Sequence, residues 1–289
     1  MKEPLLIDQP DTLAAFVRDA HSAPWLGLDT EFVRDRQYYP QPGLIQVATP
    51  DCNALIDPVA ITDLTPLAEL LCTTSMVKIL HAARQDLELF VMLFDRVPAP
   101  LYDTQIAATM TDLAAQIGYS ALVEELLSIA PGVSLGRYNW LRRPLTAEAV
   151  AYAADDVEHL ARLRELLDER LVEAGKTNAF AATMREMEDA NRYRPQPETV
   201  WKRIRQARRL GEAARLRLQR LAAWRERQAM SENRPRQWVL RDGVLVTLAR
   251  LAPSNFKDLD EVNDLSANAR RRYGQSLLET LAAEGGDDS

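Results

Sequence analysis

The chain has 289 residues, of which 47% are hydrophobic and 27% charged, a composition typical of a globular protein of about two domains. No stretch approaches the roughly 18 apolar residues of a membrane span, and Cys52 and Cys72 are too few for a disulfide framework. These features disfavour secretion and membrane insertion, so we expect a cytoplasmic protein with no membrane partner. The net charge of −7 disfavours binding to nucleic acid, unless the charge is unevenly distributed along the chain.

Three short strands are expected early in the chain. Strand-like apolar segments cover residues 25–32, 43–48 and 53–57, and proline and aspartate turn signals separate them. Three such strands in succession predict an antiparallel meander.

From Thr65 onward, strand and helix patterns alternate. Thr65 and Pro66 begin a short helix, and residues 76–80 form a buried strand. Further helices are expected over 82–94, 104–113, 120–129 and 146–173, the last with Thr146 as its N-cap. This alternation predicts an α/β domain over residues 1–190.

A proline-containing connection over residues 192–197 ends this domain, and the pattern beyond it is helical. We expect a small all-α domain over residues 198–289. Between Glu198 and Arg250, fourteen basic residues and five acids give a charge of +9, which leaves −16 on the rest of the chain. Such a segment either keeps a helical surface in solution or neutralises nucleic-acid phosphates, and the pattern is consistent with both.

Two acids stand close together on the first predicted strand. Asp29 and Glu31 are two residues apart, so the pleat points both side chains to one face. Adjacent carboxylates repel each other, and a divalent cation held between their oxygens would offset the repulsion. A solvated strand end is the simpler explanation when such a pair occurs alone.

Further acids lie on predicted helices. Tyr152 and Asp156 are four residues apart and share a helix face, and Asp86 lies near a helix start, where negative charge is favoured. Each feature alone has an ordinary structural explanation. Their order is more specific, because an acid pair on a first strand is followed by an acid after a later strand and then by Y-x-x-x-D on a late helix.

This order resembles ribonuclease D, in the tyrosine-bearing branch of the DEDD exonuclease superfamily. The resemblance covers roughly residues 5 to 185 and implies a ribonuclease-H-like mixed sheet with flanking helices. The stretches that carry it are Leu28-Asp29-Thr30-Glu31-Phe32, Tyr38-Tyr39-Pro40, Leu44-Ile45-Gln46-Val47-Ala48, His81 to Glu88, Asp103 to Ala107, and Arg143-Pro144-Leu145 through Val157.

The resemblance implies that Asp29, Glu31, Asp86 and Asp156 bind two divalent metal ions, Mg²⁺ or Mn²⁺, and that Tyr152 holds the attacking water. Asp29 would bridge the ions, Glu31 and Asp156 would complete the first site, and Asp86 would reach the second directly or through a water. All-oxygen ligands suit these hard ions, and paired ions of this kind hydrolyse phosphodiesters. A phenol with an ordinary pKa of ~10 orients the water better than it deprotonates it.

Five further side chains are predicted to contact nucleic acid. They are His81, Gln85, Arg137, Arg142 and Arg143. The last three lie in a stretch that departs from the family's pattern, which usually has lysine at position 136 and Ser-Asp at positions 138 and 139. Solubilising arginines, and a structural histidine beside a buried strand, would explain these residues equally well.

Residues 210–285 resemble the helicase-and-ribonuclease-D C-terminal domain, HRDC. The stretches that carry this resemblance are Leu221 to Arg225, Asp242 to Leu245, Ala252-Pro253-Ser254, Leu259 and Arg272-Tyr273-Gly274. It implies an HRDC-like domain that binds nucleic acid with strong salt dependence. Trp224 and Trp238 have apolar neighbours, which favours core positions over base stacking for both rings.

The sequence therefore predicts a monomeric 3'→5' exoribonuclease that releases nucleoside 5'-monophosphates from RNA 3' ends, such as those of tRNA precursors or other structured RNA. One alternative is a DNA exonuclease, because the acids act on phosphates and no motif reveals a contact to the 2'-hydroxyl. Another is a non-catalytic RNA-binding protein. The complete set of five site residues argues against it, since repelling carboxylates have no reason to stay together in a disused site.

Overall fold

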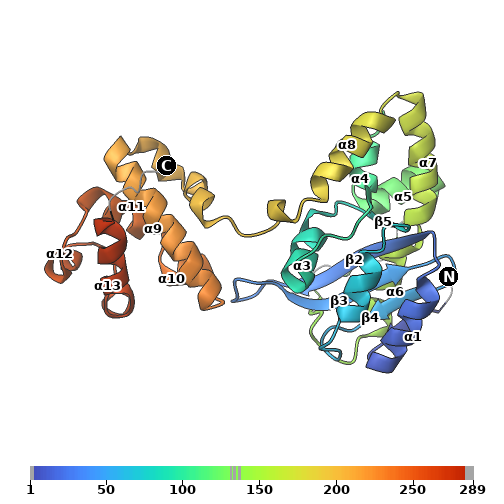
Figure 1. Ribbon diagram of the computed structural model, residues 1–289, viewed down its shortest axis with the longest axis horizontal. Helices are drawn as coiled ribbons and strands as arrows, with labels where there is room; N and C mark the ends of the chain where they lie inside the picture. Colours follow the sequence, from blue (N-terminus) through green and yellow to red (C-terminus); the bar gives the residue numbers. More distant parts are fainter. Residues whose placement is uncertain (1–2, 131, 133–134, 136–137, 284–289) are drawn as a thin grey trace. The chain divides into compact units, whose positions relative to one another are not determined.

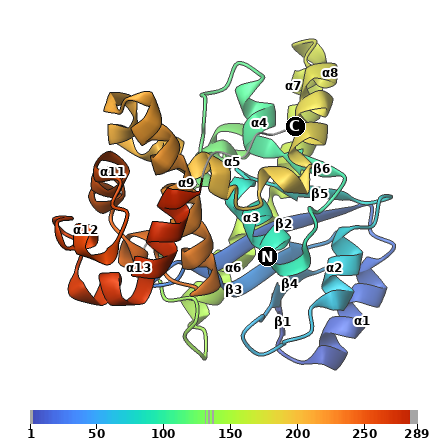
Figure 2. The same cartoon turned by 60° about the vertical axis from the view of Figure 1, so that its left-hand side comes forward.

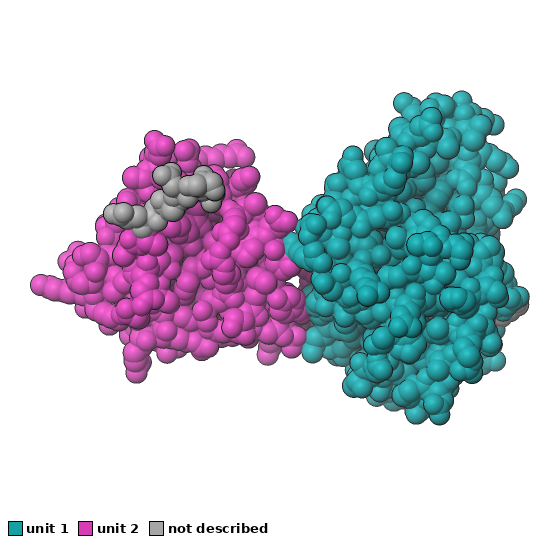
Figure 3. All heavy atoms as spheres, viewed as in Figure 1, with its two compact units in different colours: residues 1–33, 40–194 teal, residues 34–39, 195–289 magenta. Residues whose placement is uncertain are grey.

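The computed structural model describes residues 3–130, 132, 135 and 138–283, and it divides into two compact units. Unit 1 comprises residues 1–33 and 40–194, and unit 2 comprises residues 34–39 and 195–289 (Figure 3). The domain boundaries 1–190 and 198–289 stay a prediction, and the start of the second unit at Pro195 lies in the segment between them.

A six-stranded mixed sheet forms the centre of unit 1, in the order β1-β4-β3-β2-β5-β6, and all of its strands are labelled in Figure 2. The strands are β1 (Leu5–Ile7), β2 (Trp25–Val33), β3 (Gln41–Ala48), β4 (Asn53–Ile56), β5 (Val77–Leu80) and β6 (Leu101–Asp103). Strand β3 is antiparallel to β2 and β4, whereas β5 is parallel to β2 and β6 and β1 is parallel to β4. The expected antiparallel meander is confirmed, and it consists of β2, β3 and β4. Strands β1 and β6 were not predicted, because three residues are too few to show an alternating apolar pattern.

Helices flank this sheet, so the expected α/β class with a mixed sheet is confirmed. The helices of unit 1 are α1 (Pro10–Ala20), α2 (Thr65–Leu71), α3 (Arg84–Phe94), α4 (Thr104–Thr109), α5 (Tyr119–Leu127), α6 (Ala147–Glu158), α7 (Leu160–Glu173) and α8 (Thr177–Met187), with a 3₁₀ turn η1 (Ala190–Arg192). The main core of unit 1 lies between the sheet and these helices, and α7 contributes Leu160, Leu163, Leu167 and Leu171 to it. A second, smaller cluster packs Leu44, Leu55, Ala149 and Ala153 around Trp140.

The single helix expected over 146–173 is in fact two helices, α6 and α7. In a continuous helix the N–H of His159 would donate to the carbonyl oxygen of Asp155. Instead the hydroxyl of Tyr119 lies between them, donating to the Asp155 carbonyl at 2.8 Å and accepting from the His159 N–H at 3.2 Å. A side chain inserted into the helical hydrogen bonds is a known cause of a sharp bend.

Unit 2 is all-α, as expected (Figures 1 and 2). It contains the 3₁₀ segments η2 (Pro197–Arg203) and η3 (Arg205–Arg209), and the helices α9 (Glu212–Ser231), α10 (Arg236–Val239), α11 (Asp242–Leu251), α12 (Phe256–Asp260) and α13 (Ala267–Ala282). Its core surrounds buried leucines of α9, α11 and α13. Within the described part of the chain, every helix is too short or too polar to cross a bilayer.

The two tryptophans of this unit differ in burial. Trp224 packs edge-on against the buried ring of Tyr273, with ring centroids 5.6 Å apart. Trp238 is 53% exposed, so the expectation of a core position was wrong for this residue. The neighbouring Val239 and Leu240 take the buried positions in and after the short helix α10, which leaves the indole at the surface.

Candidate metal centre

Three acids from two elements meet along the second half of β2. Asp29 and Glu31 share one face of this strand, and Asp156 comes from the last turn of α6. One carboxylate oxygen from each of the three lies within 4.8 Å of the others. The structure therefore brings together three of the four acids that the sequence nominates.

Small residues let α6 approach the sheet at this point. Gly27 pairs with Ala48 across β2 and β3. A Cβ atom at Gly27 would lie 3.2 Å from the carbonyl oxygen of Val157 and 3.2 Å from the Ala48 Cβ atom. The absence of a side chain at this position keeps Asp156 close to the strand that carries Asp29.

The fourth acid, Asp86, is not a member of the three-acid group. It is 7% exposed in the first turn of α3, and its Oδ1 atom accepts a 2.5 Å hydrogen bond from the hydroxyl of Thr30. The pleat of β2 points Thr30 to the face opposite Asp29 and Glu31. The Asp86 charge still acts on the group, because it is among the causes that raise the pKa of Asp29 and of Glu31.

The pKa of every one of these acids is raised, first by burial. The pKa of Glu31 rises to about 8, that of Asp156 to about 7 and that of Asp86 to about 6, and the pKa of Asp29 lies well above its ordinary value. Repulsion between the carboxylates adds to burial for Asp29 and Glu31. The site thus concentrates negative charge in a poorly solvated place.

The donor set fits a hard divalent cation. All its ligand atoms are carboxylate oxygens, which Mg²⁺ and Mn²⁺ prefer. The Oδ2 atom of Asp156 is buried and has no hydrogen-bond partner among the described residues. A buried anionic oxygen without a donor is costly, and a bound cation would satisfy it.

Tyr152 lies one helical turn before Asp156 on α6. Its ring leans against Trp140, with centroids 6.1 Å apart. Burial raises the pKa of the Tyr152 hydroxyl, and the charges of Asp156 and Glu31 raise it further. The phenol is therefore protonated at neutral pH and can donate a hydrogen bond toward the acids.

Trp140 forms the platform under Tyr152. Its indole is 5% exposed and contacts the ring of Tyr138 edge-on, with centroids 4.7 Å apart. The backbone of Gly43 on β3 approaches so closely that a Cβ atom there would lie 2.6 Å from the Trp140 Cβ atom. The glycine in the strand motif thus makes room for the tryptophan.

Arg143 joins the loop that contains Trp140 to the sheet, and its side chain has no donor left for the nucleic-acid contact predicted from the sequence. Its Nε and one Nη2 hydrogen donate to the Asp57 carboxylate at 2.5 and 2.6 Å. Its other hydrogens donate to the carbonyl oxygens of Gly43, Trp140 and Arg142. All five N–H donors of a guanidinium are used in this way, and none remains for a phosphate.

The other predicted contacts have different surroundings. Both ring nitrogens of His81 already have protein partners, the Thr104 hydroxyl at 2.9 Å and the Ile117 carbonyl oxygen at 3.0 Å. Gln85 and Arg142 are exposed, and their contact with nucleic acid stays a prediction. Arg137 lies outside the described residues.

Three polar residues around the acids escaped the sequence analysis, namely Thr30, Gln46 and Tyr119. Gln46 pairs with Asp29 across β2 and β3, is 0% exposed, and places its Nε2 atom 3.5 Å from the Asp29 Oδ2 atom. A signal existed for it, because an amide inside the apolar run of β3 needs a buried partner. Thr30 and Tyr119 carry no such signal in the sequence.

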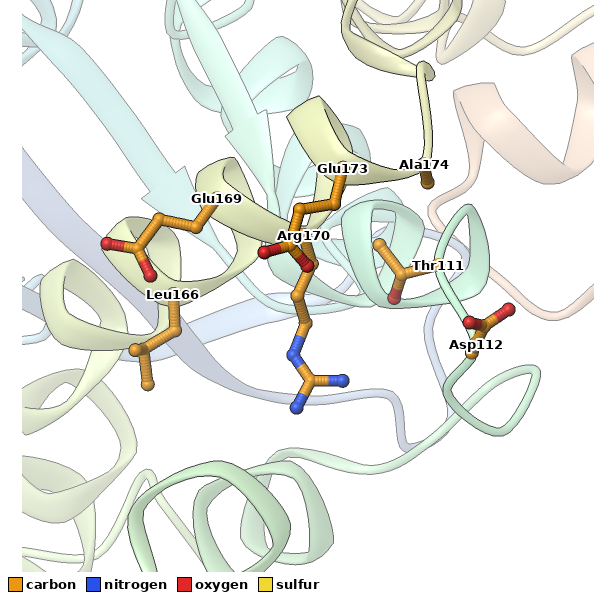
Figure 4. Close-up of a pocket in the computed structure, with 7 residues that line it drawn as sticks. All are labelled: Thr111, Asp112, Leu166, Glu169, Arg170, Glu173 and Ala174. Carbon is orange, nitrogen blue, oxygen red and sulfur yellow. The ribbon is translucent and has the colours of Figure 1, made fainter.

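A cavity of about 530 Å³ lies elsewhere in unit 1 (Figure 4). It is lined by Thr111, Asp112, Leu166, Glu169, Arg170, Glu173 and Ala174. None of these residues belongs to the acid cluster, so the cavity takes no part in the site described above.

Both parts of the chain match known families. Residues 4–172 match the family model of a 3'-5' exonuclease, and residues 214–281 match that of the HRDC domain. Ribonuclease D of Gluconacetobacter diazotrophicus is 38% identical over 287 residues, which cover 97% of this chain and 72% of that protein. Ribonuclease D of Pseudomonas paraeruginosa is 40% identical over 278 residues, which cover 94% and 72%.

Solved structures agree with these matches. RNase D of Escherichia coli, described as an exoribonuclease involved in structured RNA processing, superposes with a TM-score of 0.87 at 36% identity, covering 96% of this chain and 74% of that one. The catalytic core of RRP6 from Trypanosoma brucei has the same fold at 18% identity, with a TM-score of 0.68 over 97% of this chain and 79% of that one.

Proposed function

The chain belongs to the ribonuclease D family and is a 3'→5' exoribonuclease, and we propose that Asp29, Glu31, Asp86, Tyr152 and Asp156 carry its chemistry. One observation supports this assignment most directly, the convergence of three carboxylates within 4.8 Å beside a buried Asp156 oxygen that lacks a partner. We propose Mg²⁺ or Mn²⁺ as the cofactor, with two ions bound.

Two such ions, when bound, supply a water of lowered pKa and charge stabilisation for the departing 3'-oxygen. Asp29 would contribute to both ion sites, Glu31 and Asp156 to one, and Asp86 to the other directly or through a water. The Tyr152 hydroxyl, kept protonated by its raised pKa, would orient the attacking water by a hydrogen bond. Hydrolysis at the terminal phosphodiester then releases a nucleoside 5'-monophosphate.

The assignment is tested with Asp29→Asn. This change removes one anionic ligand oxygen, and we expect turnover to fall by about 10²-fold or more, by analogy with the loss of other single stabilising groups. The measurement is Mg²⁺-dependent release of nucleoside 5'-monophosphates from a 3'-extended tRNA, with a chelator as blank. Near-normal turnover in Asp29→Asn would contradict the assignment.

Asp155→Asn is the matched control. Asp155 adjoins Asp156, but it faces His159 with 3.8 Å between its Oδ1 atom and the His159 Nε2 atom. Because it lies outside the acid cluster, this variant should keep most of its activity.

We propose tRNA precursors or other structured RNA as the substrate. The E. coli relative, which is described as acting in structured RNA processing, supports this choice. A DNA oligonucleotide matched to the tRNA 3' end belongs in the same assay, because the acids act on phosphates and contacts to the 2'-hydroxyl must provide any discrimination. Equal turnover on RNA and DNA would count against an RNA-specific role.

For unit 2, we propose that RNA binds at a cavity of about 380 Å³ between α10 and α13. The exposed indole of Trp238 lines it together with Arg234, Arg241 and Arg272. Arg234 and Arg272 both pair with Glu232, at 3.2 and 2.8 Å, whereas Arg241 has no ion-pair partner among the described residues. An indole and guanidinium groups on one surface suit a stacked base and its phosphates.

Trp238→Ala tests this surface. Loss of one stacking platform should weaken binding to single-stranded RNA by about 1–3 kcal/mol. The measurement is fluorescence anisotropy in the presence of a chelator, so that cleavage does not interfere. Leu251→Ala, which removes another exposed apolar side chain of unit 2 outside the cavity, should bind as the unchanged protein does. Cytoplasmic location and the monomeric state stay predictions from the sequence.

A further inference from the structure

Tyr119 lies at the start of α5, far from the acids in sequence, yet its hydroxyl occupies the junction of α6 and α7. It donates to the Asp155 carbonyl oxygen at 2.8 Å and accepts from the His159 N–H at 3.2 Å. Asp156 belongs to the helical turn that these two groups bracket. We propose that Tyr119 is a positioning residue of the metal site, which places the Asp156 carboxylate by keeping α6 and α7 as two helices.

The break matters because the two helices pack on different partners. Helix α6 contacts β2, β3 and β4, whereas α7 packs against α4, α5 and β5 and touches β2. Ala149 and Ala153 seat α6 around Trp140, and Leu160 and Leu163 seat α7 in the main core. The change of direction after Glu158 lets both faces be buried and fixes where the last turn of α6 ends.

The hydroxyl can perform this task only as a neutral group, because a phenolate could not donate to the Asp155 carbonyl. Burial raises the pKa of Tyr119, and the charges of Asp155, Asp156 and Asp29 raise it further. The hydroxyl therefore stays protonated at neutral pH. The ring has a separate contact, edge-on to His81 with centroids 5.8 Å apart, which phenylalanine would keep.

Removing the hydroxyl leaves two outcomes for the backbone. Either the His159 N–H moves to bond directly to the Asp155 carbonyl, which straightens the helix, or the Asp155 carbonyl loses the hydroxyl donor and the His159 N–H keeps only its contact with the Val157 carbonyl oxygen. The turn that carries Asp156 shifts in each case. This inference rests on the proposed metal site, because a displaced Asp156 matters only if its carboxylate holds a cation.

The test compares Tyr119→Phe with Tyr102→Phe in the full chain. Tyr102 is a second buried tyrosine, on β6, whose ring packs against Phe180 and whose hydroxyl is buried without a hydrogen-bond partner among the described residues. The affinity for Mn²⁺ is measured by calorimetry, the Mn²⁺ electron paramagnetic resonance spectrum is recorded, and the melting temperature is taken in chelator.

We expect Tyr119→Phe to bind Mn²⁺ about 10- to 100-fold more weakly, with an altered spectrum, as found when residues that orient metal ligands are removed. Its melting temperature in chelator should lie only a few degrees below that of Tyr102→Phe, because Tyr119→Phe loses two hydrogen bonds of modest net worth and Tyr102→Phe loses an unpaired hydroxyl. In an Asp156→Asn background, Tyr119→Phe should cause no additional loss of affinity, because the two changes act through the same ligand.

Three results separate the possible failures. Unchanged Mn²⁺ affinity in Tyr119→Phe overturns the positioning role. A melting temperature far below that of the control also overturns it, because the hydroxyl would then hold the fold and not the ligand. A wild-type protein that binds no Mn²⁺ refutes the proposed metal site itself, whatever Tyr119 does.

Discussion

Gln46 is a fully buried amide whose side chain makes one long hydrogen bond, to Asp29, among the described residues. Its Nε2 atom faces the Asp29 Oδ2 atom at 3.5 Å, and its Oε1 atom is buried without a hydrogen-bond partner among the described residues. A half-satisfied buried amide costs stability. We therefore expect the Gln46 amide to serve in orienting the Asp29 carboxylate and not in stabilising the fold.

Replacing Gln46 by leucine separates these two effects. The variant Gln46→Leu should have an unchanged free energy of unfolding, or one higher by up to about 1 kcal/mol, because an unpaired oxygen is removed. Its affinity for Mn²⁺ should fall by about 10-fold or more, because the Asp29 carboxylate loses a donor that orients it. Urea unfolding in chelator and Mn²⁺ calorimetry measure the two quantities.

Thr49→Val is the control for this prediction. Thr49 is a buried polar residue just after β3 whose hydroxyl bonds to the Cys52 carbonyl, away from the acids. It should lower stability without changing Mn²⁺ affinity. If Gln46→Leu also lowers stability and leaves the affinity for Mn²⁺ unchanged, the amide has only a structural role.

The raised pKa values of the site acids predict how stability depends on pH. The pKa of Glu31 rises from 4.5 to about 8 and that of Asp156 from 3.8 to about 7, both first because of burial. An acid whose folded-state pKa is raised favours folding below its unfolded value, and this contribution is lost as pH rises through the folded value. The metal-free protein should therefore lose stability between about pH 5 and pH 8.

Divalent metal should reverse this trend, because binding requires the deprotonated carboxylates. The increase in melting temperature caused by Mg²⁺ should be larger at pH 8.5 than at pH 6. Glu31→Gln should flatten the pH dependence of the metal-free protein and reduce the Mg²⁺ effect. Scanning calorimetry at both pH values, with Mg²⁺ or chelator, tests this, and a Mg²⁺ effect that shrinks with rising pH would refute it.

At the scale of elements, the support of Tyr152 depends on how closely β3 approaches the loop before α6. A Cβ atom at Gly43 would lie 2.6 Å from the Trp140 Cβ atom and 2.9 Å from the Trp140 carbonyl oxygen. Because backbone atoms cannot give way locally, Gly43→Ala must displace the loop. We expect a loss of about 1–3 kcal/mol in unfolding free energy from overpacking.

Activity should fall with it, mainly in kcat, because the Trp140 platform moves under Tyr152. Gly243→Ala is the control, since a Cβ atom there meets nothing within 4 Å and alanine favours the helix that contains it. Thermal unfolding and steady-state kinetics on the same RNA measure both effects. Wild-type kcat in Gly43→Ala would show that the platform does not reach the reacting groups.

The sequence predicted most elements of unit 1 but missed the break between two of its helices. Alternating apolar patterns are local, so β2, β3, β4 and most helices of unit 1 were foreseen. The break between α6 and α7 was not, because its cause is a hydroxyl from Tyr119, 40 residues from His159 in sequence. Periodicity reports which face of a helix is apolar and is silent on which distant side chain enters its hydrogen bonds.

The sequence likewise predicted one part of the candidate site and missed another. The order of acids along the chain nominated Asp29, Glu31 and Asp156, which do meet. The bond from Thr30 to Asp86 could not be foreseen, because it depends on the angle at which α3 leaves the sheet. The role of Arg143 also escaped, since an arginine beside a substrate motif looks the same in sequence whether it binds phosphate or, as here, Asp57.

Over the whole molecule, charge is segregated along the chain. The segment from Glu198 to Arg250 carries +9 and the remainder −16. Unit 2 contains the basic segment, and its η3 exposes Arg205, Arg208 and Arg209, none of which has an ion-pair partner among the described residues. These exposed arginines, in a basic segment of an otherwise acidic chain, should bind RNA phosphates, and the affinity should fall steeply as salt increases.

Replacing the three exposed η3 arginines by alanine tests this in the slowed Asp29→Asn background with chelator present, so that RNA stays intact. The slope of log affinity against log salt should become shallower by about 2, since each neutralised phosphate on a single strand contributes roughly 0.7. The matched control replaces three exposed cations of unit 1, Arg18, Arg96 and Lys176, by alanine, which changes the net charge equally. If both triple variants flatten the slope by the same amount, RNA responds to the total charge of the protein, and the basic segment is not its binding surface.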